Sequence, residues 1–386
     1  MKKTNPYISL FKSYSEYFNS EFTDRYISFE SLEKYLKQHI FNSYTSQIIG
    51  YSEQDRPIYS IDLGSGPTKI LIWSQMHGNE STTTKAILDF FNYLQINKSS
   101  AFVQNLLKTC HIRIIPMLNP DGASYYTRLN ANNVDLNRDA LQQTQSETQA
   151  FFKHLNKFKP DYCFNMHGQR TIFSAREAEF PATLSFLAPS YDKGLSLNAT
   201  RKKAMKLIVA GCETLNEFIP QQIGRYDDAH NPNCFGDNIQ KLGIPTVLFE
   251  AGHFPNDYNR NETRRYVMMS LLKMLESIST KAIDAYNHNI YFDIPMNRKL
   301  YLDCIIKNVN NTQSGYLGIM FKEVLQQNHI SFLPFVSSLD DLSSYFGHRY
   351  IDAKHKNIYV NESDQIRLNT DIQNLRIGDS FIDFNF

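Results

Sequence analysis

Long hydrophobic runs are absent from the 386-residue sequence. No window approaches the roughly 18 consecutive apolar residues that a membrane-spanning helix needs. Polar residues also interrupt the N-terminal segment, residues 1–18, so it lacks the continuous apolar stretch of a secretory signal. We therefore expect neither a membrane anchor nor a signal peptide.

Cysteine is scarce as well. The five cysteines, Cys110, Cys163, Cys212, Cys234 and Cys304, are odd in number and form no C-x-x-C pair. This scatter excludes a dense disulfide framework and favours buried free thiols in a reducing compartment. Together with the missing signal peptide, it predicts a cytoplasmic location.

Neither sign of charge dominates: 40 basic residues face 39 acidic ones, and the net charge is +1. The sequence therefore lacks the broad basic surface that nucleic acids or anionic membranes attract. With 42% hydrophobic and 20% charged residues, the composition is that of a globular chain. Its length allows one large core and a smaller second domain.

Short apolar runs alternate with helical patterns through most of the chain. The pattern predicts strands at 46–51, 57–63, 69–75, 112–117, 162–166 and 246–249, and helices at 28–38, 81–94, 144–158, 196–218 and 261–286. Strands alternating with helices are typical of an α/β fold whose mixed, mostly parallel sheet is flanked by helices. We assign residues 1–288 to this larger domain, with 1–44 as a helical lead-in.

The character of the sequence changes after residue 288. Residues 289–386 contain short alternating runs at 358–360, 365–368 and 381–386, and a stretch at 318–327 that reads as a helix. We expect a small α+β or strand-rich C-terminal domain. It carries no residue pattern with evident chemistry, so it is either an inert brace or a wall that limits substrate size.

A histidine and a glutamate lie at the first strand-to-helix corner, in Met76-His77-Gly78-Asn79-Glu80. Alone, this H-x-x-E spacing also fits a surface histidine beside a helix-start carboxylate. His167 follows a second apolar strand, and the carboxyl ends of strands in open α/β sheets lie at one edge. Two imidazoles and a carboxylate are ligands that a catalytic zinc ion accepts.

Three further groups fall at the same predicted edge. Asn119-Pro120-Asp121-Gly122 is first of all a turn, and Arg128 and Arg138 follow it in a loop. Planar guanidinium groups near a metal suit carboxylates and oxyanions. Glu250 ends an apolar strand, where a carboxylate must be paired, metal-linked or functional.

This combination resembles the zinc metallocarboxypeptidase family of the carboxypeptidase A type. The resemblance rests on H-G-N-E at 77–80, N-P-D-G at 119–122, Arg128, V-D-L-N-R at 134–138, His167 and the T-V-L-F-E-A-G strand around Glu250. It covers about residues 45–285, and the C-terminal domain falls outside it.

The resemblance implies a role for each matching residue. His77, Glu80 and His167 would bind one zinc ion per chain, with Asp135 orienting a ligand histidine. Glu250 would act as general base and Arg128 would polarise the scissile carbonyl. Asn137 and Arg138 would clasp the terminal carboxylate of the substrate, and Tyr226 is the best match for the family's mobile tyrosine. Phe235 and Asp237 lie in the stretch expected to set side-chain preference.

The expected activity is zinc-dependent hydrolysis of a peptide or amide bond next to a free C-terminal carboxylate. Expected partners are thus peptides or amino-acid amides with that carboxylate. The aspartoacylase and succinylglutamate desuccinylase enzymes share H-G-N-E and D-L-N-R, so an N-acyl amino acid deacylase is the alternative. A non-catalytic binding module on the same fold is less favoured, because it would be free to lose Glu250.

Overall fold

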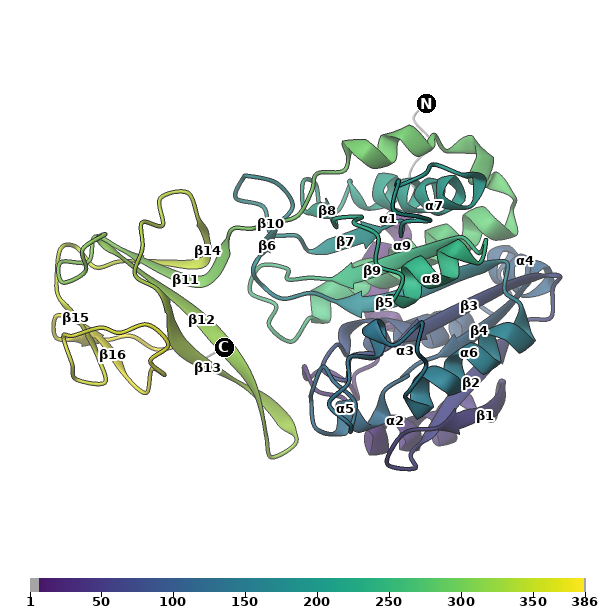
Figure 1. The fold of residues 1–386 in the computed structure, drawn as a ribbon, viewed down its shortest axis with the longest axis horizontal. Helices are drawn as coiled ribbons and strands as arrows, with labels where there is room; N and C mark the ends of the chain where they lie inside the picture. Colours follow the sequence, from purple (N-terminus) through teal and green to yellow (C-terminus); the bar gives the residue numbers. More distant parts are fainter. Residues whose placement is uncertain (1–6, 385–386) are drawn as a thin grey trace.

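An eight-stranded mixed sheet forms the centre of the structure, a computed structural model that describes residues 7–384 (Figure 1). Its order is β1-β2-β4-β3-β5-β9-β7-β8, and the central strands β4, β3, β5 and β9 run parallel. The strands are β1 (Thr45–Tyr51), β2 (Pro57–Leu63), β3 (Thr68–Ser74), β4 (Cys110–Ile115), β5 (Tyr162–Gly168), β7 (Leu184–Leu187), β8 (Ile223–Arg225) and β9 (Thr246–Ala251). The predicted fold class is confirmed.

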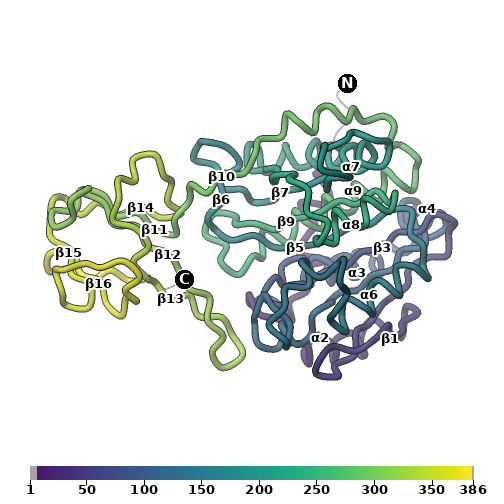
Figure 2. The backbone as a smooth tube through the Cα atoms, in the orientation of Figure 1, coloured from purple at the N-terminus to yellow at the C-terminus, as the bar shows by residue number. Residues whose placement is uncertain are grey.

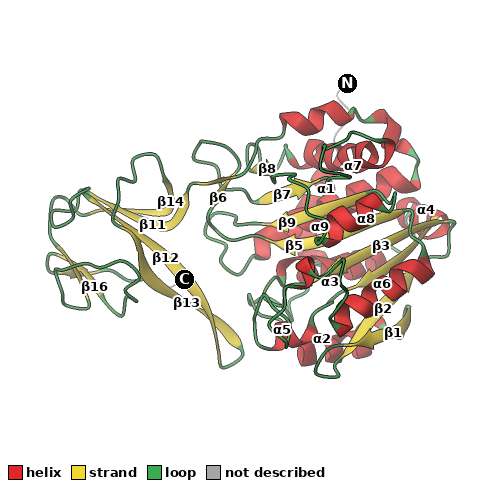
Figure 3. Ribbon diagram, viewed as in Figure 1, coloured by secondary structure: helices red, strands yellow, loops and turns green. Residues whose placement is uncertain are grey.

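Helices cover both faces of this sheet (Figure 3). They are α1 (Tyr7–Lys12), α2 (Phe29–Tyr35), α3 (Thr82–Ile96), α4 (Ala101–Thr109), α5 (Pro120–Ser124), α6 (Ser146–Phe158), α7 (Ala199–Leu215), α8 (Phe235–Lys241) and α9 (Asn261–Ser279). Successive side chains of a strand point to opposite faces. In β3, Ile70 and Ile72 therefore pack in the core under α3, α7 and α9, while Leu71 and Trp73 pack under α6 and α8.

The C-terminal part builds a separate four-stranded sheet of order β13-β12-β11-β14, visible as a distinct lobe in Figure 2. Its strands are β11 (Tyr301–Lys307), β12 (Tyr316–Gln326), β13 (His329–Ser338) and β14 (Phe346–Asp352), and β15 (Ile358–Val360), β16 (Leu375–Ile377) and β17 (Ser380–Phe381) form a small sheet beside it. Strands β6 (Phe173–Ser174) and β10 (Arg298–Lys299) pair where the two parts join. Tyr291 and Ile294 still pack in the hydrophobic core of the main domain, on the face of the large sheet that α3, α7 and α9 cover. The predicted division at 288/289 stays a prediction.

The helix predicted at 318–327 is wrong, because this segment lies in β12. A short apolar run does not distinguish a strand from a helix by itself. Here the segment is a strand because it forms a long hairpin with β13, in which each residue from Gly318 to Gln326 has a partner. Gln327 and Asn328 both have positive φ, 49° and 66°, as a tight two-residue hairpin turn requires.

Two other C-terminal predictions also differ from the structure. Residues 365–368 form a loop, and only the start of 381–386 is extended, in β17. Residues 385 and 386 of that run lie outside the described chain, as does the start of the predicted lead-in, residues 1–6. Within residues 7–384, no helix is long and apolar enough to cross a membrane.

A buried ion pair fastens the N-terminal lead-in to the main domain. Asp89 of α3 and Arg264 of α9 are fully buried, and Arg264 Nε donates to Asp89 Oδ2 at 2.6 Å. Arg264 also donates to the carbonyl of Phe22, and the Asn19 backbone N–H donates to Asp89. The hydroxyl group of Tyr14 donates to the same carboxylate. One charge pair thus holds three separate segments.

Replacing Asp89 by asparagine is expected to lower the free energy of unfolding by about 3–5 kcal/mol, because it leaves the Arg264 charge buried and unpaired. Urea unfolding measures this change. Asp284→Asn is the matched control, because Asp284 pairs with Lys206 at the surface and its side chain is 91% exposed. A loss below about 1 kcal/mol for Asp89→Asn, similar to that of the control, would contradict the anchoring role.

Candidate active site

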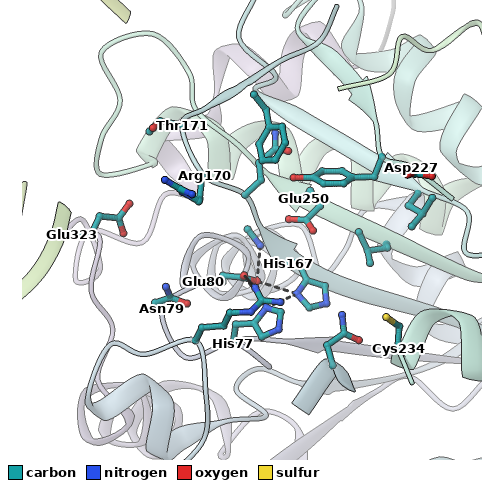
Figure 4. Close-up of a pocket in the computed structure, with 18 of the residues that line it drawn as sticks. His77, Asn79, Glu80, His167, Arg170, Thr171, Asp227, Cys234, Glu250 and Glu323 are labelled. Atoms are coloured by element: carbon teal, nitrogen blue, oxygen red, sulfur yellow. Dashed lines mark hydrogen bonds and ion pairs between the residues drawn. The ribbon is translucent and has the colours of Figure 1, made fainter. Parts of the chain in front are cut away.

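The candidate site lies at the carboxyl edge of the parallel strands. The chain leaves β3 and reaches His77 and Glu80 just before α3 begins. His167 belongs to the end of β5, and in the neighbouring strand β9 its register partner is Glu250. These side chains converge in one cleft (Figure 4). Parallel pairing of β3, β5 and β9 is therefore what brings residues far apart in the sequence together.

Tight backbone packing fixes the corner that carries His77. Asn119 caps α5 through the Gly122 N–H and donates from Nδ2 to the carbonyl oxygen of Met76 at 3.1 Å. Gly78 lies directly on this turn: a Cβ atom there would come within 1.9 Å of the Gly122 backbone. The Asn-Pro-Asp-Gly segment therefore positions the His77 corner rather than entering the chemistry itself.

Three potential ligand groups meet at the centre of the cleft. His77 Nδ1 lies 2.8 Å from Glu80 Oε1, and His167 Nδ1 lies 3.0 Å from Glu80 Oε2 and 3.1 Å from His77 Nδ1. The Gly168 backbone N–H also donates to Glu80 Oε2 at 3.0 Å. All three side chains are buried.

The donor set fits a zinc ion. One ligand atom from each of His77, Glu80 and His167 lies within 4.8 Å of the others, and two imidazole nitrogens with a carboxylate are ligands that catalytic zinc accepts. Asp135 Oδ1 lies 3.0 Å from His77 Nε2, which places the ring proton there and leaves Nδ1 with a free lone pair. Burial lowers the pKa of His167, which favours the neutral imidazole that a metal ligand needs. Burial also lowers the pKa of His77, but the Glu80 and Asp135 carboxylates raise it overall.

Arg128 lies over the edge of this cluster with its side chain 45% exposed. Its Nε and Nη2 atoms donate to Asp135 Oδ2 at 3.1 and 3.0 Å, and Nη1 approaches Glu80 Oε1 at 3.4 Å. Asp135 thus bridges the arginine and His77. The predicted arginine and the predicted orienting carboxylate both lie beside the ligand cluster.

Glu250 lies next to the cluster with a perturbed carboxyl group. Burial raises its pKa well above the usual range, the nearby Glu80 charge raises it further, and Arg128 opposes both. A cation bound to Glu80 would offset part of that repulsion. Tyr226 lines the same cleft, and burial followed by the Glu250 charge raises the pKa of its phenol. The tyrosine that the resemblance suggested therefore also lines the cleft.

Asn137 and Arg138 also line the cleft. The Asn137 side chain accepts from the Phe235 backbone N–H at 2.9 Å, which leaves its amide N–H groups available. Arg138 is exposed, and its Nη1 atom contacts the Asn137 carbonyl at 2.7 Å and Cys234 Sγ at 3.1 Å. The thiols of the other four cysteines are buried as predicted, but Cys234 is only partly buried and lines the cleft.

Two residues considered for side-chain preference differ in position. Phe235 is fully buried and packs on Trp73, Phe151 and Phe152, so its ring belongs to the core. Asp237 lines the cleft, where its carboxylate accepts from the backbone N–H groups of Ser190 and Asn231 at 2.9 and 2.6 Å. Burial raises its pKa.

The residues of the far wall of the cleft could not be predicted from sequence motifs. The cavity measures about 710 Å³, and Arg25 from the lead-in lines it together with residues of the C-terminal part. The latter are Asp303, Met320, Phe321, Glu323 and Phe332. They belong to no motif, and only the tertiary packing of β11, β12 and β13 brings them to the site.

Comparison with known proteins gives the same family. The family described as "Zinc carboxypeptidase" matches residues 30–208. "Carboxypeptidase SOL1" of Arabidopsis thaliana is 31% identical over 183 residues, which are 42% of this chain and 36% of that protein. "Carboxypeptidase D" of Mus musculus is 23% identical over 279 residues, 61% of this chain and 20% of that protein. The match thus spans about a third or less of either relative's length.

Solved structures share the fold. A metallo-carboxypeptidase from Burkholderia cenocepacia has a TM-score of 0.54 at 15% identity, covering 67% of this chain and 71% of that one. Bovine thrombin-activatable fibrinolysis inhibitor, solved in complex with tick carboxypeptidase inhibitor, has a TM-score of 0.54 at 16% identity, covering 68% of this chain and 100% of that one. Residues 30–208 thus match the zinc carboxypeptidase family, and the chain shares its fold with solved metallo-carboxypeptidases.

Proposed function

We propose that this protein is a zinc-dependent carboxypeptidase that hydrolyses the amide bond next to a free C-terminal carboxylate. The match of residues 30–208 to the zinc carboxypeptidase family supports a hydrolase. The observation that carries the proposal is the convergence of His77, Glu80 and His167 in one cleft with Glu250 and Arg138. One zinc ion per chain, bound by the first three residues, completes the proposed site.

Zinc bound there would lower the pKa of a water molecule and polarise the scissile carbonyl group. Glu250 takes the proton of the attacking water and then delivers it to the leaving amine. A raised pKa makes the Glu250 carboxylate a stronger base for the first of these steps. Burial in the cleft is the main cause of that shift.

Arg128 stabilises the negative charge that develops on the carbonyl oxygen. In the structure two of its nitrogens are held by Asp135, which fixes the plane of the guanidinium group. Its Nη1 atom, only 3.4 Å from Glu80, is the donor that can turn to the oxyanion. Asp135 therefore serves two purposes, since it also holds the His77 ring.

Asn137 and Arg138 hold the terminal carboxylate of the substrate. A guanidinium group can donate two parallel hydrogen bonds to a carboxylate, and the neighbouring Asn137 amide can add a third. Tyr226, which lines the same cleft, is the candidate for a further contact to the substrate. Fixing the carboxylate in this way sets which bond lies over the metal site, which defines an exopeptidase.

The comparisons do not favour the alternative, an N-acyl amino acid deacylase, because the family and the relatives are carboxypeptidases. A non-catalytic module is less favoured because the complete set, Glu250 included, lies in one cleft. A cytoplasmic location is proposed on the sequence alone.

Zinc binding is expected to depend on both histidines. His77→Ala and His167→Ala should each lose the metal, because two protein ligands hold zinc poorly at a site designed for three. Elemental analysis of the purified variants measures the zinc per chain. His39→Ala is the control, because that histidine pairs with Glu21 at the surface. Zinc contents equal to the wild type in both cleft variants would remove the ligand assignment.

Glu250→Gln is expected to keep fold and zinc and to lose at least about a hundredfold in kcat, because the amide cannot accept a proton. Rates are measured on N-blocked dipeptides, with N-acyl amino acids as comparison substrates. Glu213→Gln is the control, because Glu213 is exposed on α7, away from the cleft. Near-normal turnover by Glu250→Gln would exclude it as the base, and faster turnover of N-acyl amino acids would favour the deacylase.

Amidating the substrate carboxylate is expected to reduce kcat/KM by about tenfold or more, and Arg138→Lys should cause a similar loss on the free acid. Because Arg138 is exposed, we expect the loss in kcat/KM to lie at the lower end of the range for a broken ion pair. Steady-state kinetics of the four combinations form a double-mutant cycle. When amidation and Arg138→Lys are combined, the loss in activation free energy should be smaller than the sum of the two single losses. Fully additive losses would mean that Arg138 does not contact this carboxylate.

A further inference from the structure

The C-terminal lobe reaches the cleft through one face of its long hairpin. Side chains alternate along β12, so Phe321, Glu323 and Leu325 share a face, and their partners on β13 include Phe332 and Ile330. This face is turned to the main domain: Figure 1 shows the hairpin extending from its own sheet toward α5. Phe321, Glu323 and Phe332 line the same cavity as the ligand cluster.

The two ends of this face are packed on the main domain by apolar contacts. Near the tip, Ile330 is buried with Tyr26 and Tyr126. Nearer the base, Tyr258 contacts the rings of Phe321 and Phe332 edge-on, with ring centroids 5.5 and 5.2 Å apart. Its hydroxyl group donates to Asp303 of β11 at 3.0 Å. The hairpin is therefore fastened at both ends of its contact face.

A charged residue lies in the middle of that otherwise apolar face. Glu323 Oε2 lies 3.4 Å from Arg25 Nε and accepts the hydroxyl hydrogen of Tyr126. The Arg25 side chain is 5% exposed, and its Nη1 atom donates to Thr82 at the start of α3 at 2.7 Å. Burial alone would lower the pKa of Arg25, but the Glu323 and Glu80 charges raise it overall. The pair thus lies within electrostatic reach of the ligand cluster.

The hairpin and the proposed carboxylate clasp lie on opposite sides of the ligand cluster. Arg138 of the proposed carboxylate clasp contacts Cys234 Sγ at 3.1 Å, and Figure 4 shows Cys234 and Glu323 on opposite sides of the ligand cluster. Glu323 faces Arg170 and Thr171 across the other side (Figure 4). A peptide held by its C-terminal carboxylate would run past the metal site toward Glu323, and the chain preceding the scissile bond would meet the hairpin.

We propose that the β12–β13 hairpin closes the acyl side of the cleft, so that the enzyme acts on short peptides. Glu323 is the positioning residue that holds this wall against Arg25 and Tyr126. The inference rests on the proposed carboxypeptidase function. It assigns the C-terminal domain a part in substrate selection, and the hairpin excludes longer chains by occupying their path.

Substrate length is the test. Tripeptides and ten-residue peptides with the same two C-terminal residues are compared on the zinc-loaded full chain. The wild type should prefer the tripeptide by at least about tenfold in kcat/KM, and Glu323→Gln should narrow that ratio at least about threefold by weakening the wall. Ile330→Ser, at the tip, should narrow it independently. Glu362→Gln, which removes an exposed carboxylate that pairs with Arg376 in the same lobe, should not.

The outcomes separate this inference from the proposed function. No hydrolysis of any peptide by the wild type would overturn the carboxypeptidase proposal itself. Hydrolysis without a length preference, or a preference unchanged in both Glu323→Gln and Ile330→Ser, would overturn only the wall. Circular dichroism and zinc content show whether the variants are folded and carry zinc. A general loss of structure would lower the rates on the tripeptide and on the ten-residue peptide alike, so it would leave the ratio of the two rates unchanged.

Discussion

The register of three parallel strands is the constraint on which the candidate site depends. His77 follows β3, His167 ends β5 and Glu250 ends β9, and the pairing of β5 with β9 sets His167 directly beside Glu250. A one-residue slip would turn these side chains to the opposite face of the sheet. The buried apolar residues of β3 and β5 prevent such a slip, because they fill the cores on both faces. Packing remote from the cleft therefore fixes its chemistry.

Two carboxylates of the cleft each contact two partners. Asp135 holds both the His77 ring and the Arg128 guanidinium, and Glu80 contacts both histidines. Buried charges are stable only when each has a partner, and a cation among these ligands would complete that pairing. A second such network, around Arg25 and Glu323, joins the lobes. The Glu80 charge also contributes to the raised pKa of Arg25, after the larger contribution of Glu323.

Much of the fold and the cluster could be predicted because strand ends and turn residues are local signals. The H-G-N-E corner and the V-D-L-N-R loop fall where the sheet edge places them. The segment at 318–327 was misassigned because its apolar run fits either element until β13 is known to pair with it. The ion pair of Glu323 with Arg25 could not be predicted for a related reason. The two residues come together only where the two lobes meet, and neither belongs to a motif.

Anomalous X-ray diffraction at the zinc absorption edge, on crystals of the protein prepared with zinc, tests the central claim most directly. The account predicts a single strong peak in the cleft, about 2.0–2.2 Å from a nitrogen of His77, a nitrogen of His167 and a carboxylate oxygen of Glu80. A peak elsewhere, or none in this cleft at full zinc loading, would contradict it.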